Sequence, residues 1–176
     1  MTYKECRRLI KLDVERNGKK TICGFYFFYR TGRLLYRYRI TNYLVSKRML
    51  RPLYYIERLL YHLSCIKCGC DIPSHVKIGG GVKIRHPNGI VINSKVEMGE
   101  NVTILSGCVI GRNHSGVPKI GNNVYIGSHA LIIGGVNIGN HVDIGAGAIV
   151  THDVPDNAVV ICDSAHILKI KEPMNE

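Results

Sequence analysis

The chain has 176 residues, of which 45% are hydrophobic and 21% are charged, and it contains no tryptophan. This length predicts one domain with room for a small appended segment, and no apolar run reaches the roughly 18 residues of a membrane-spanning helix. The N-terminal sequence MTYKECRRLIK is too charged for a signal peptide, so we expect a cytosolic protein with reduced thiols.

The formal net charge of +11 is unevenly distributed along the chain. Residues 1–71 contain 16 Lys and Arg against 5 Asp and Glu, whereas residues 72–176 contain 8 of each kind. All three Phe and nine of the ten Tyr also precede residue 72. The composition therefore predicts a basic, aromatic-rich segment at 1–70 followed by a region of different structure.

The first region is predicted to be helical. An amphipathic helix is expected near residues 9–14, and residues 43–64 carry apolar side chains at helical spacing, with a kink or restart at Pro52. The stretch FYFFYRTGRLLYRYR allows two interpretations. It forms either a helical cap with solvated arginines, or a surface attracted to an anionic membrane or a lipid-linked glycan. No nucleic-acid motif accompanies the charge, so nucleic acid is not an expected partner.

Three cysteines lie close together at the end of this region, at Cys65, Cys68 and Cys70. Such spacing can ligate zinc, but a structural zinc site needs a fourth ligand and no neighbour supplies one. We therefore expect no metal.

From residue 72 an aliphatic residue recurs every six positions, and a glycine often follows it. A small or β-branched residue stands four positions after most of these aliphatic residues. A period of six fits neither an α-helix nor one long strand, but it is typical of a solenoid of stacked parallel strands. We therefore expect a mainly β domain at 71–160 and a tail at 161–176. The repeated positions are Ile72, Ile78, Ile84, Ile92, Met98, Ile104, Ile110, Ile120, Ile126, Ile132, Ile138, Ile144 and Val150.

The sequences DIPSHVKIGGGVKIRHPNGIVINSKVEMGENVTILSGCVIG (71–111) and PKIGNNVYIGSHALIIGGVNIGNHVDIGAGAIVTHDVPDNAVV (118–160) resemble the hexapeptide acyltransferases, particularly the serine acetyltransferase branch. The join KCGCDIP is similar to KYGIDIP in that family. The resemblance implies a left-handed parallel β-helix with a small α-helical N-terminal segment. It also implies acetyl-CoA as co-substrate and a homotrimer with sites between neighbouring prisms.

The repeat breaks between Ile84 and Ile92, which are eight residues apart, and His86 lies in this break. The resemblance implies that His86 is the general base and that Asp71, fifteen residues earlier, orients it. An alcohol needs such a base, because it is a poor nucleophile until its proton is removed, and a carboxylate fixes the histidine tautomer. The alternative is that His86 is only a polar loop residue.

Counting the insertions predicts a column of residues along one edge of the prism. The resemblance implies that coenzyme A lies along this column, where Gly127 and Gly145 let the backbone approach the ligand. It also places Lys169 of the tail near the 3′-phosphate. The alternatives are ordinary repeat turns and a solvated lysine. The predicted column consists of His86, Ser106, Ser128 and Ala146.

A second insertion, GRNHSGVP, fills residues 111–118. Serine-specific members of the family carry Arg-His-Pro where this chain ends the loop with Gly116, Val117 and Pro118, and an aspartate where it has Arg85. His114 is a candidate replacement in binding the acceptor. Serine contacts therefore look lost while the acetyl-transfer machinery looks retained.

In the helical segment, Asp13 and Glu15 are out of register with the acidic residue that completes the family's serine site. We accordingly predict an acetyl-CoA-dependent O-acetyltransferase whose acceptor is a sugar hydroxyl in surface polysaccharide biosynthesis. L-Serine is the first alternative, and antibiotic acetylation is a further one. From another class, the alternative is a catalytically silent scaffold or binding module.

Overall fold

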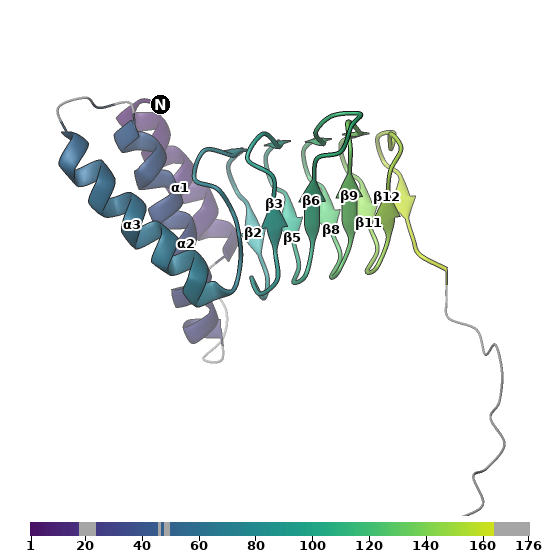
Figure 1. Ribbon diagram of the computed structural model, residues 1–176. Helices are drawn as coiled ribbons and strands as arrows, with labels where there is room; N and C mark the ends of the chain where they lie inside the picture. Colours follow the sequence, from purple (N-terminus) through teal and green to yellow (C-terminus); the bar gives the residue numbers. More distant parts are fainter. Residues whose placement is uncertain (18–23, 46, 48–49, 164–176) are drawn as a thin grey trace, which may run out of the picture.

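The computed structural model describes residues 1–17, 24–45, 47 and 50–163. In this part of the chain, three helices pack against one end of a three-sided prism of stacked coils (Figure 1). Helix α1 spans Tyr3–Asn17, α2 spans Gly24–Val45 and α3 spans Arg51–Cys68. The mainly β fold with a helical N-terminal segment, as predicted, is confirmed.

The prism is built from two- and three-residue strands, each pointing the same way as its neighbour in the adjacent coil. The first face has the order β1-β4-β7-β10, the second β13-β11-β8-β5-β2 and the third β12-β9-β6-β3. All pairings are parallel, so three strands and three turns complete one coil. The strands are β1 (Lys77–Ile78), β2 (Lys83–Ile84), β3 (Val91–Ile92), β4 (Glu97–Met98), β5 (Thr103–Ile104), β6 (Val109–Gly111), β7 (Lys119–Ile120), β8 (Tyr125–Ile126), β9 (Leu131–Ile133), β10 (Asn137–Ile138), β11 (Asp143–Ile144), β12 (Ile149–Val150) and β13 (Val159–Val160).

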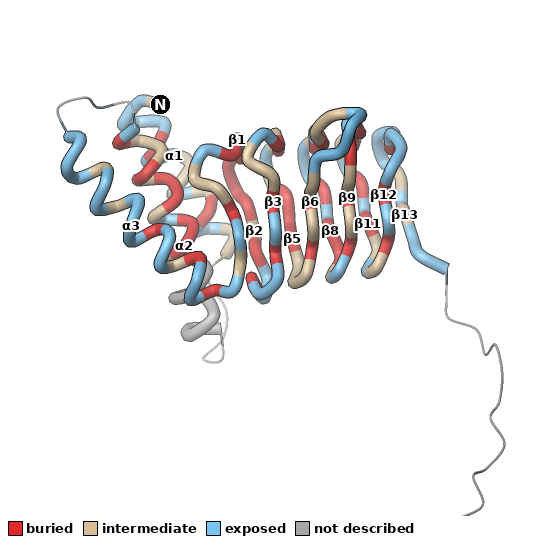
Figure 2. The backbone as a smooth tube through the Cα atoms, viewed as in Figure 1, coloured by how far each residue is buried: buried red, intermediate tan, exposed pale blue. Residues whose placement is uncertain are grey.

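The period of six follows from how each short strand uses its two residues. Successive side chains on a strand point to opposite sides, so the second residue points into the prism while the first points outward. On the second face, Ile84, Ile104, Ile126 and Ile144 stack directly on one another and are almost fully buried. Figure 2 shows the resulting line of buried residues inside the prism.

The helices cap the open end of the prism. The first coil has no preceding coil to bond its carbonyl groups, and buried backbone groups without a partner are costly. Side chains of the helices donate to these carbonyls instead: Tyr61 to Ile72 at 2.6 Å, and Arg16 to Gly81 at 2.9 Å. The hydroxyl of Tyr38 donates to a third carbonyl in the same coil.

A buried ion pair joins α1 and α2 at this junction. Asp13 Oδ2 lies 2.8 Å from Arg39 Nε, and the two side chains are only 6% and 3% exposed. Arg39 also donates to the carbonyl of Ile78 at 2.7 Å, and Asp13 accepts from the N–H of Val82 at 3.2 Å. The predicted cap is therefore present, but this arginine is buried and paired instead of solvated.

Pro52 lies in the first turn of α3, where its missing N–H has no helical acceptor to lose. The predicted restart at this proline is confirmed, because α2 ends at Val45 and α3 begins at Arg51. Within the residues described above, no helix combines the length and the apolar character required to cross a membrane.

Candidate active site

The loop between β2 and β3 carries His86 and interrupts the repeat without disturbing the strands beside it. Ile84 pairs with Ile104, and Ile92 pairs with Ile110, as in uninterrupted coils. The extra residues therefore bulge outward at the edge between the second and third faces. His86 is exposed there with a φ of 52°, a left-handed conformation that costs a residue with a Cβ roughly 1–2 kcal/mol. The same conformation occurs in other turns of the prism, so it does not by itself mark a functional residue; it is found at Asn101, Asn123, His129, His141 and Asn157.

The column along this edge differs from the predicted one. The N–H of Gly107 donates to the carbonyl of Asn88 at 2.9 Å, and the equivalent bond recurs in the next two coils. The prediction that His86 heads the column is wrong, because Asn88 and not His86 makes this bond. Arg85 still bonds the carbonyl of Ile104, so the two extra residues are His86 and Pro87. The observed column consists of Asn88, Ser106, Ser128 and Ala146.

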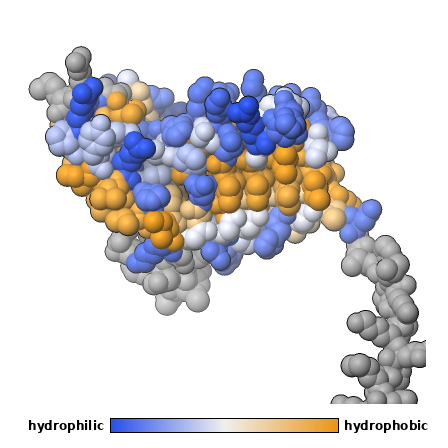
Figure 3. Space-filling view, viewed as in Figure 1, coloured by the Kyte–Doolittle hydropathy of each residue, from blue (hydrophilic) through white to orange (hydrophobic). Residues whose placement is uncertain are grey.

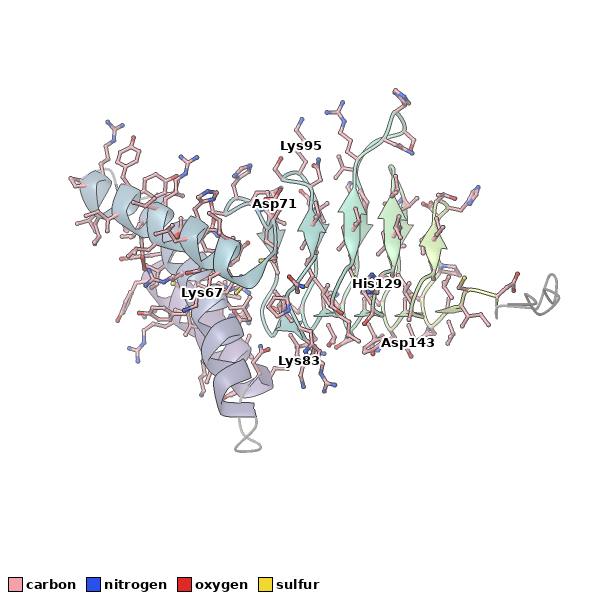
Figure 4. The ribbon with its side chains drawn as sticks, turned by 60° about the horizontal axis from the view of Figure 1, so that its bottom comes forward. Lys67, Asp71, Lys83, Lys95, His129 and Asp143 are labelled. Carbon is pink, nitrogen blue, oxygen red and sulfur yellow. The ribbon has the colours of Figure 1, made fainter. Side chains whose placement is uncertain are left out.

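Asp71 stands at the start of the third face and is exposed. Its N–H donates to the carbonyl of Ile90 at 2.8 Å, and its own carbonyl accepts from the N–H of Ile92 at 2.9 Å. The strand that leaves the His86 loop is thus hydrogen-bonded to the segment that carries Asp71. Figure 4 shows Asp71 where α3 gives way to the prism.

Gly69 connects the C-terminal end of α3 to the loop that carries His86. It adopts a left-handed conformation with a φ of 65°, and its carbonyl accepts from the N–H of Gly89 at 2.6 Å. A Cβ at Gly69 would lie 2.2 Å from Oδ1 of Asn88. The helical segment therefore sets the position of the His86 loop directly.

The predicted coenzyme A residues follow β8 and β11 on the same edge. A Cβ at Gly127 would lie 2.6 Å from the backbone nitrogen of Ala146, so the stacking of coils by itself requires glycine there. Ser128 is half-buried, with its Oγ 3.5 Å from Oγ of Ser106, and Ala146 is exposed. Gly145 is half-buried in the next coil. These residues are close together, whereas Lys169 lies outside the described residues.

The second insertion forms a tight loop between β6 and β7, at the other edge of the third face. Oγ of Ser115 accepts from the N–H of Gly135 at 2.9 Å, which holds the loop against the next coil. His114 is exposed at the loop tip, whereas Val117 packs partly buried against the core. Within one chain, Arg85 therefore stands beside the His86 loop, while His114 and Val117 lie at the opposite edge of the face.

A pocket of about 530 Å³ opens between α3 and the first coil. Asp71 lines it and His86 does not, so the pocket adjoins one member of the predicted catalytic pair. Sequence reasoning missed this pocket, because its walls come from a helix and a coil whose packing the repeat does not specify. The lining residues are Tyr55, Arg58, Leu59, Tyr61, His62, Cys65, Asp71, Ile72, Pro73, Ser74 and His75.

Cations gather on the second face next to the His86 loop. Burial lowers the pKa of Lys83, and the nearby guanidinium groups of Arg85 and Arg16 lower it further. Figure 4 shows Lys83 on this side of the prism. The side of the loop that faces the second face thus carries positive charge suited to an anionic ligand.

The cysteines near the site are thiols. None of the six cysteines in the described residues forms a disulfide, and no group of three or more possible metal ligands occurs among those residues. A hydrogen bond between Cys65 and Cys70 lowers the pKa of Cys65 and raises the pKa of Cys70.

The sequence is similar to known acetyltransferases. The family described as bacterial transferase hexapeptide (six repeats) matches residues 118–152. A serine acetyltransferase of Helicobacter pylori is 33% identical over 135 residues, covering 73% of this chain and 75% of the relative. The putative colanic acid biosynthesis acetyltransferase WcaB of Escherichia coli is 32% identical over 131 residues, covering 72% and 81%. A serine acetyltransferase of Synechococcus elongatus is 33% identical over 150 residues, but the match covers only 58% of its length.

Solved structures show the same architecture. Serine acetyltransferase isoform 3 of Entamoeba histolytica, in complex with cysteine, has a TM-score of 0.79 over 97% of this chain and 62% of its own, with 22% identity. This match shows the fold alone. Serine acetyltransferase of Neisseria gonorrhoeae has a TM-score of 0.74 and 26% identity, over 95% of this chain and 67% of its own. The chain belongs to the serine acetyltransferase-like family of hexapeptide-repeat transferases.

Proposed function

We propose that the protein is an acetyl-CoA-dependent O-acetyltransferase with His86 as general base and Asp71 as its orienting partner. The observation that carries this proposal is the break in the repeat. It holds an exposed histidine on a loop whose far end is hydrogen-bonded to the Asp71 segment. The fold itself does not need this insertion, because the strands on both sides keep their register.

The reaction requires a general base next to the hydroxyl group that receives the acetyl group. A ring nitrogen of His86 takes the hydroxyl proton as the oxygen attacks the thioester carbonyl, and Asp71 stabilises the imidazolium that forms. Backbone N–H groups stabilise the tetrahedral oxyanion. When the C–S bond breaks, the imidazolium returns the proton to the coenzyme A thiolate. The O-acetyl ester and free coenzyme A leave the site.

The edge between the second and third faces suits the thioester substrate. Small residues at Ser128, Gly145 and Ala146 leave the backbone accessible, whereas Gly127 is buried against the next coil. Coils repeat at roughly 4.8 Å, so three coils give a groove of roughly 14 Å for the pantetheine arm. Lys169 in the tail is our candidate for the 3′-phosphate.

We propose a homotrimer that buries the third face. Apart from Asp71 at its start, its outward positions are apolar, with Val91 42% and Ile149 67% exposed, whereas the outward positions of the first face are polar, as at Lys77 and Glu97. Figure 3 shows this apolar band along the prism. When three prisms turn one face toward a common axis, each edge of that face meets the opposite edge of a neighbour. The His114 loop of one chain would then adjoin His86 of the next. A sedimentation mass of three chains supports this arrangement, and a monomer contradicts it.

The acceptor that we favour is a sugar hydroxyl in surface polysaccharide biosynthesis, in the cytosol. Three features support a sugar over L-serine: Arg85 beside the base, the core-packed Val117, and a buried ion pair that occupies Asp13. Exposed apolar side chains on α3, including Leu53 and Ile56, together with the basic segment 1–71, suit contact with a membrane surface or a lipid-linked glycan.

L-Serine is the second candidate, and the relatives named serine acetyltransferase support it at least as well. The deciding experiment incubates the purified chain with acetyl-CoA and either L-serine or a panel of mono- and disaccharides. Thiol release measures turnover, and mass spectrometry identifies the product. We expect O-acetylated saccharide. Efficient acetylation of L-serine would overturn the sugar acceptor, and no transfer to any acceptor would favour a silent scaffold.

A further inference from the structure

The pocket between α3 and the first coil offers an acceptor site that the family resemblance does not assign. Its volume of about 530 Å³ falls within the roughly 300–1,000 Å³ typical of pockets that enclose small ligands. Asp71 lies in its wall, whereas His86 is not among the lining residues, so a molecule bound there lies beside one member of the proposed catalytic pair. The inference below therefore rests on the proposed acetyl transfer, which it deepens.

Arg58 gives the pocket its charge. It is exposed on α3, and among the described residues it has no carboxylate within ion-pair distance. The neighbouring Glu57 is already engaged, with Oε2 at 2.7 Å from Nη1 of Arg37. His62 lies one helical turn from Arg58 in the same wall, and His75 lines the pocket as well. The pocket therefore contains one guanidinium group and two imidazole groups.

Asp71 is the only carboxylate among the residues that line the pocket in the described part of the chain. A free amino acid carries both an ammonium and a carboxylate, and its ammonium needs an anion of its own. Asp71 cannot serve that purpose while it orients His86. The lining therefore favours an acceptor with a carboxylate and no ammonium.

The apolar part of the lining suits a sugar ring. Tyr55 is 62% exposed, and its ring packs against that of Tyr54 with centroids 5.4 Å apart, which holds it in place. Tyr61 is buried and its hydroxyl is committed to the carbonyl of Ile72, so it forms a wall. Leu59 adds a further apolar side chain. A pyranose offers such surfaces an apolar C–H face, while its hydroxyl groups remain solvated or hydrogen-bonded.

We propose that this pocket binds the acceptor as a saccharide that carries a carboxylate. Arg58 pairs with that carboxylate through its planar, two-pronged donor geometry, and Tyr55 packs on the ring face. Arg58 and Cys65 are seven residues apart on α3, which corresponds to roughly 10 Å along the helix axis. The pocket is therefore long enough for the carboxylate to stand either on the sugar ring that receives the acetyl group or on the adjacent ring.

The test compares two disaccharides that differ only in the proposed contact: cellobiuronic acid, in which a carboxylate replaces one hydroxymethyl group, and cellobiose. Calorimetry in the presence of coenzyme A measures binding, and thiol release measures transfer from acetyl-CoA. We expect the full chain to bind cellobiuronic acid about tenfold or more tightly than cellobiose. Arg58→Gln removes this preference, and Arg58→Lys restores part of it.

Arg51→Gln is the matched control, because Arg51 is exposed on the same helix but does not line the pocket. The preference survives in this variant. Equal binding of both disaccharides, or a preference that persists in Arg58→Gln, overturns the pocket assignment even if acetyl transfer occurs. Binding that depends on Arg58 without transfer to any acceptor keeps the pocket and overturns the transferase.

Discussion

The helical segment and the prism are stabilised in different ways, and the difference explains where the site lies. The prism repeats one interaction, an aliphatic side chain stacked on its equivalent in the next coil. The helices instead supply individual polar side chains, such as Tyr61 and Arg16, that bond the unpaired carbonyls of the first coil. A solenoid needs such a cap, because its terminal repeat lacks a neighbour. The candidate site lies where the cap meets the first break in the repeat.

The largest effect on stability is expected from breaking the cap. Arg39→Ala leaves the carboxylate of Asp13 buried without its cation, which costs about 3–5 kcal/mol in unfolding free energy. Urea denaturation measures the loss. The control is Glu15→Ala, which removes the exposed Lys11–Glu15 pair and changes the midpoint little. Equal shifts in the two variants would mean that the buried pair does not hold the cap.

The next largest effect tests the repeat itself. Ile104 is fully buried in the middle of the prism, so Ile104→Ala lowers the unfolding free energy by about 2–5 kcal/mol. Val159 is exposed on the second face, and Val159→Ala serves as the control with little change. A small loss at Ile104 would contradict the stacked core as the source of prism stability.

A smaller effect is expected where the two regions meet. In Gly69→Ala, a residue with a Cβ must adopt a left-handed conformation, which costs about 1–2 kcal/mol. The added Cβ would also lie 2.2 Å from Oδ1 of Asn88. Gly147→Ala is the matched control, because its φ is +71° and nothing lies within 4 Å of the added Cβ. Gly69→Ala should therefore destabilise more than Gly147→Ala and also slow acetyl transfer.

The double variant Gly69→Ala/Asn88→Ala separates the two causes. Removing the Asn88 amide relieves the contact but leaves the backbone strain, so part of the lost activity returns. If the double variant is no faster than Gly69→Ala, the helix end does not act through Asn88.

The smallest effect concerns the alkaline limit of stability. Burial raises the pKa of Tyr38 from 10.0 to about 12. Between these values the unfolded chain releases the phenolic proton while the folded chain keeps it, so the unfolding free energy falls as pH rises from 10 to about 12. Tyr38→Phe has no such proton and loses stability less steeply over this interval. Identical slopes in thermal melts of both proteins would contradict the buried state of Tyr38.

How much the sequence predicted also differs between the two regions. The period of six specified the prism, because each inward isoleucine repeats a single local rule. It also located the break that holds His86, but not the register of the column, since counting residues does not show which two residues of the loop are the extra ones. The cap was less predictable. Asp13 is buried although Val14 beside it is 47% exposed, and its partner Arg39 is 26 positions away, so only packing joins the two residues.

The pocket beside Asp71 was beyond sequence reasoning for a related reason. Its walls depend on the angle at which α3 meets the first coil, and Gly69 and Pro52 limit where the helix begins and ends without fixing that angle. The period of a sequence repeat predicts the coils of the prism, whereas the junction between α3 and the first coil depends on contacts between particular residues.

The account depends most on His86 acting as a proton acceptor. The most direct measurement is kcat/KM for acetyl transfer by His86→Ala, with the acceptor that the wild-type chain acetylates. We predict a loss of about 10²–10⁴-fold, with unchanged thermal stability and unchanged binding of coenzyme A. Transfer by this variant at the wild-type rate would contradict general-base catalysis at the break in the repeat.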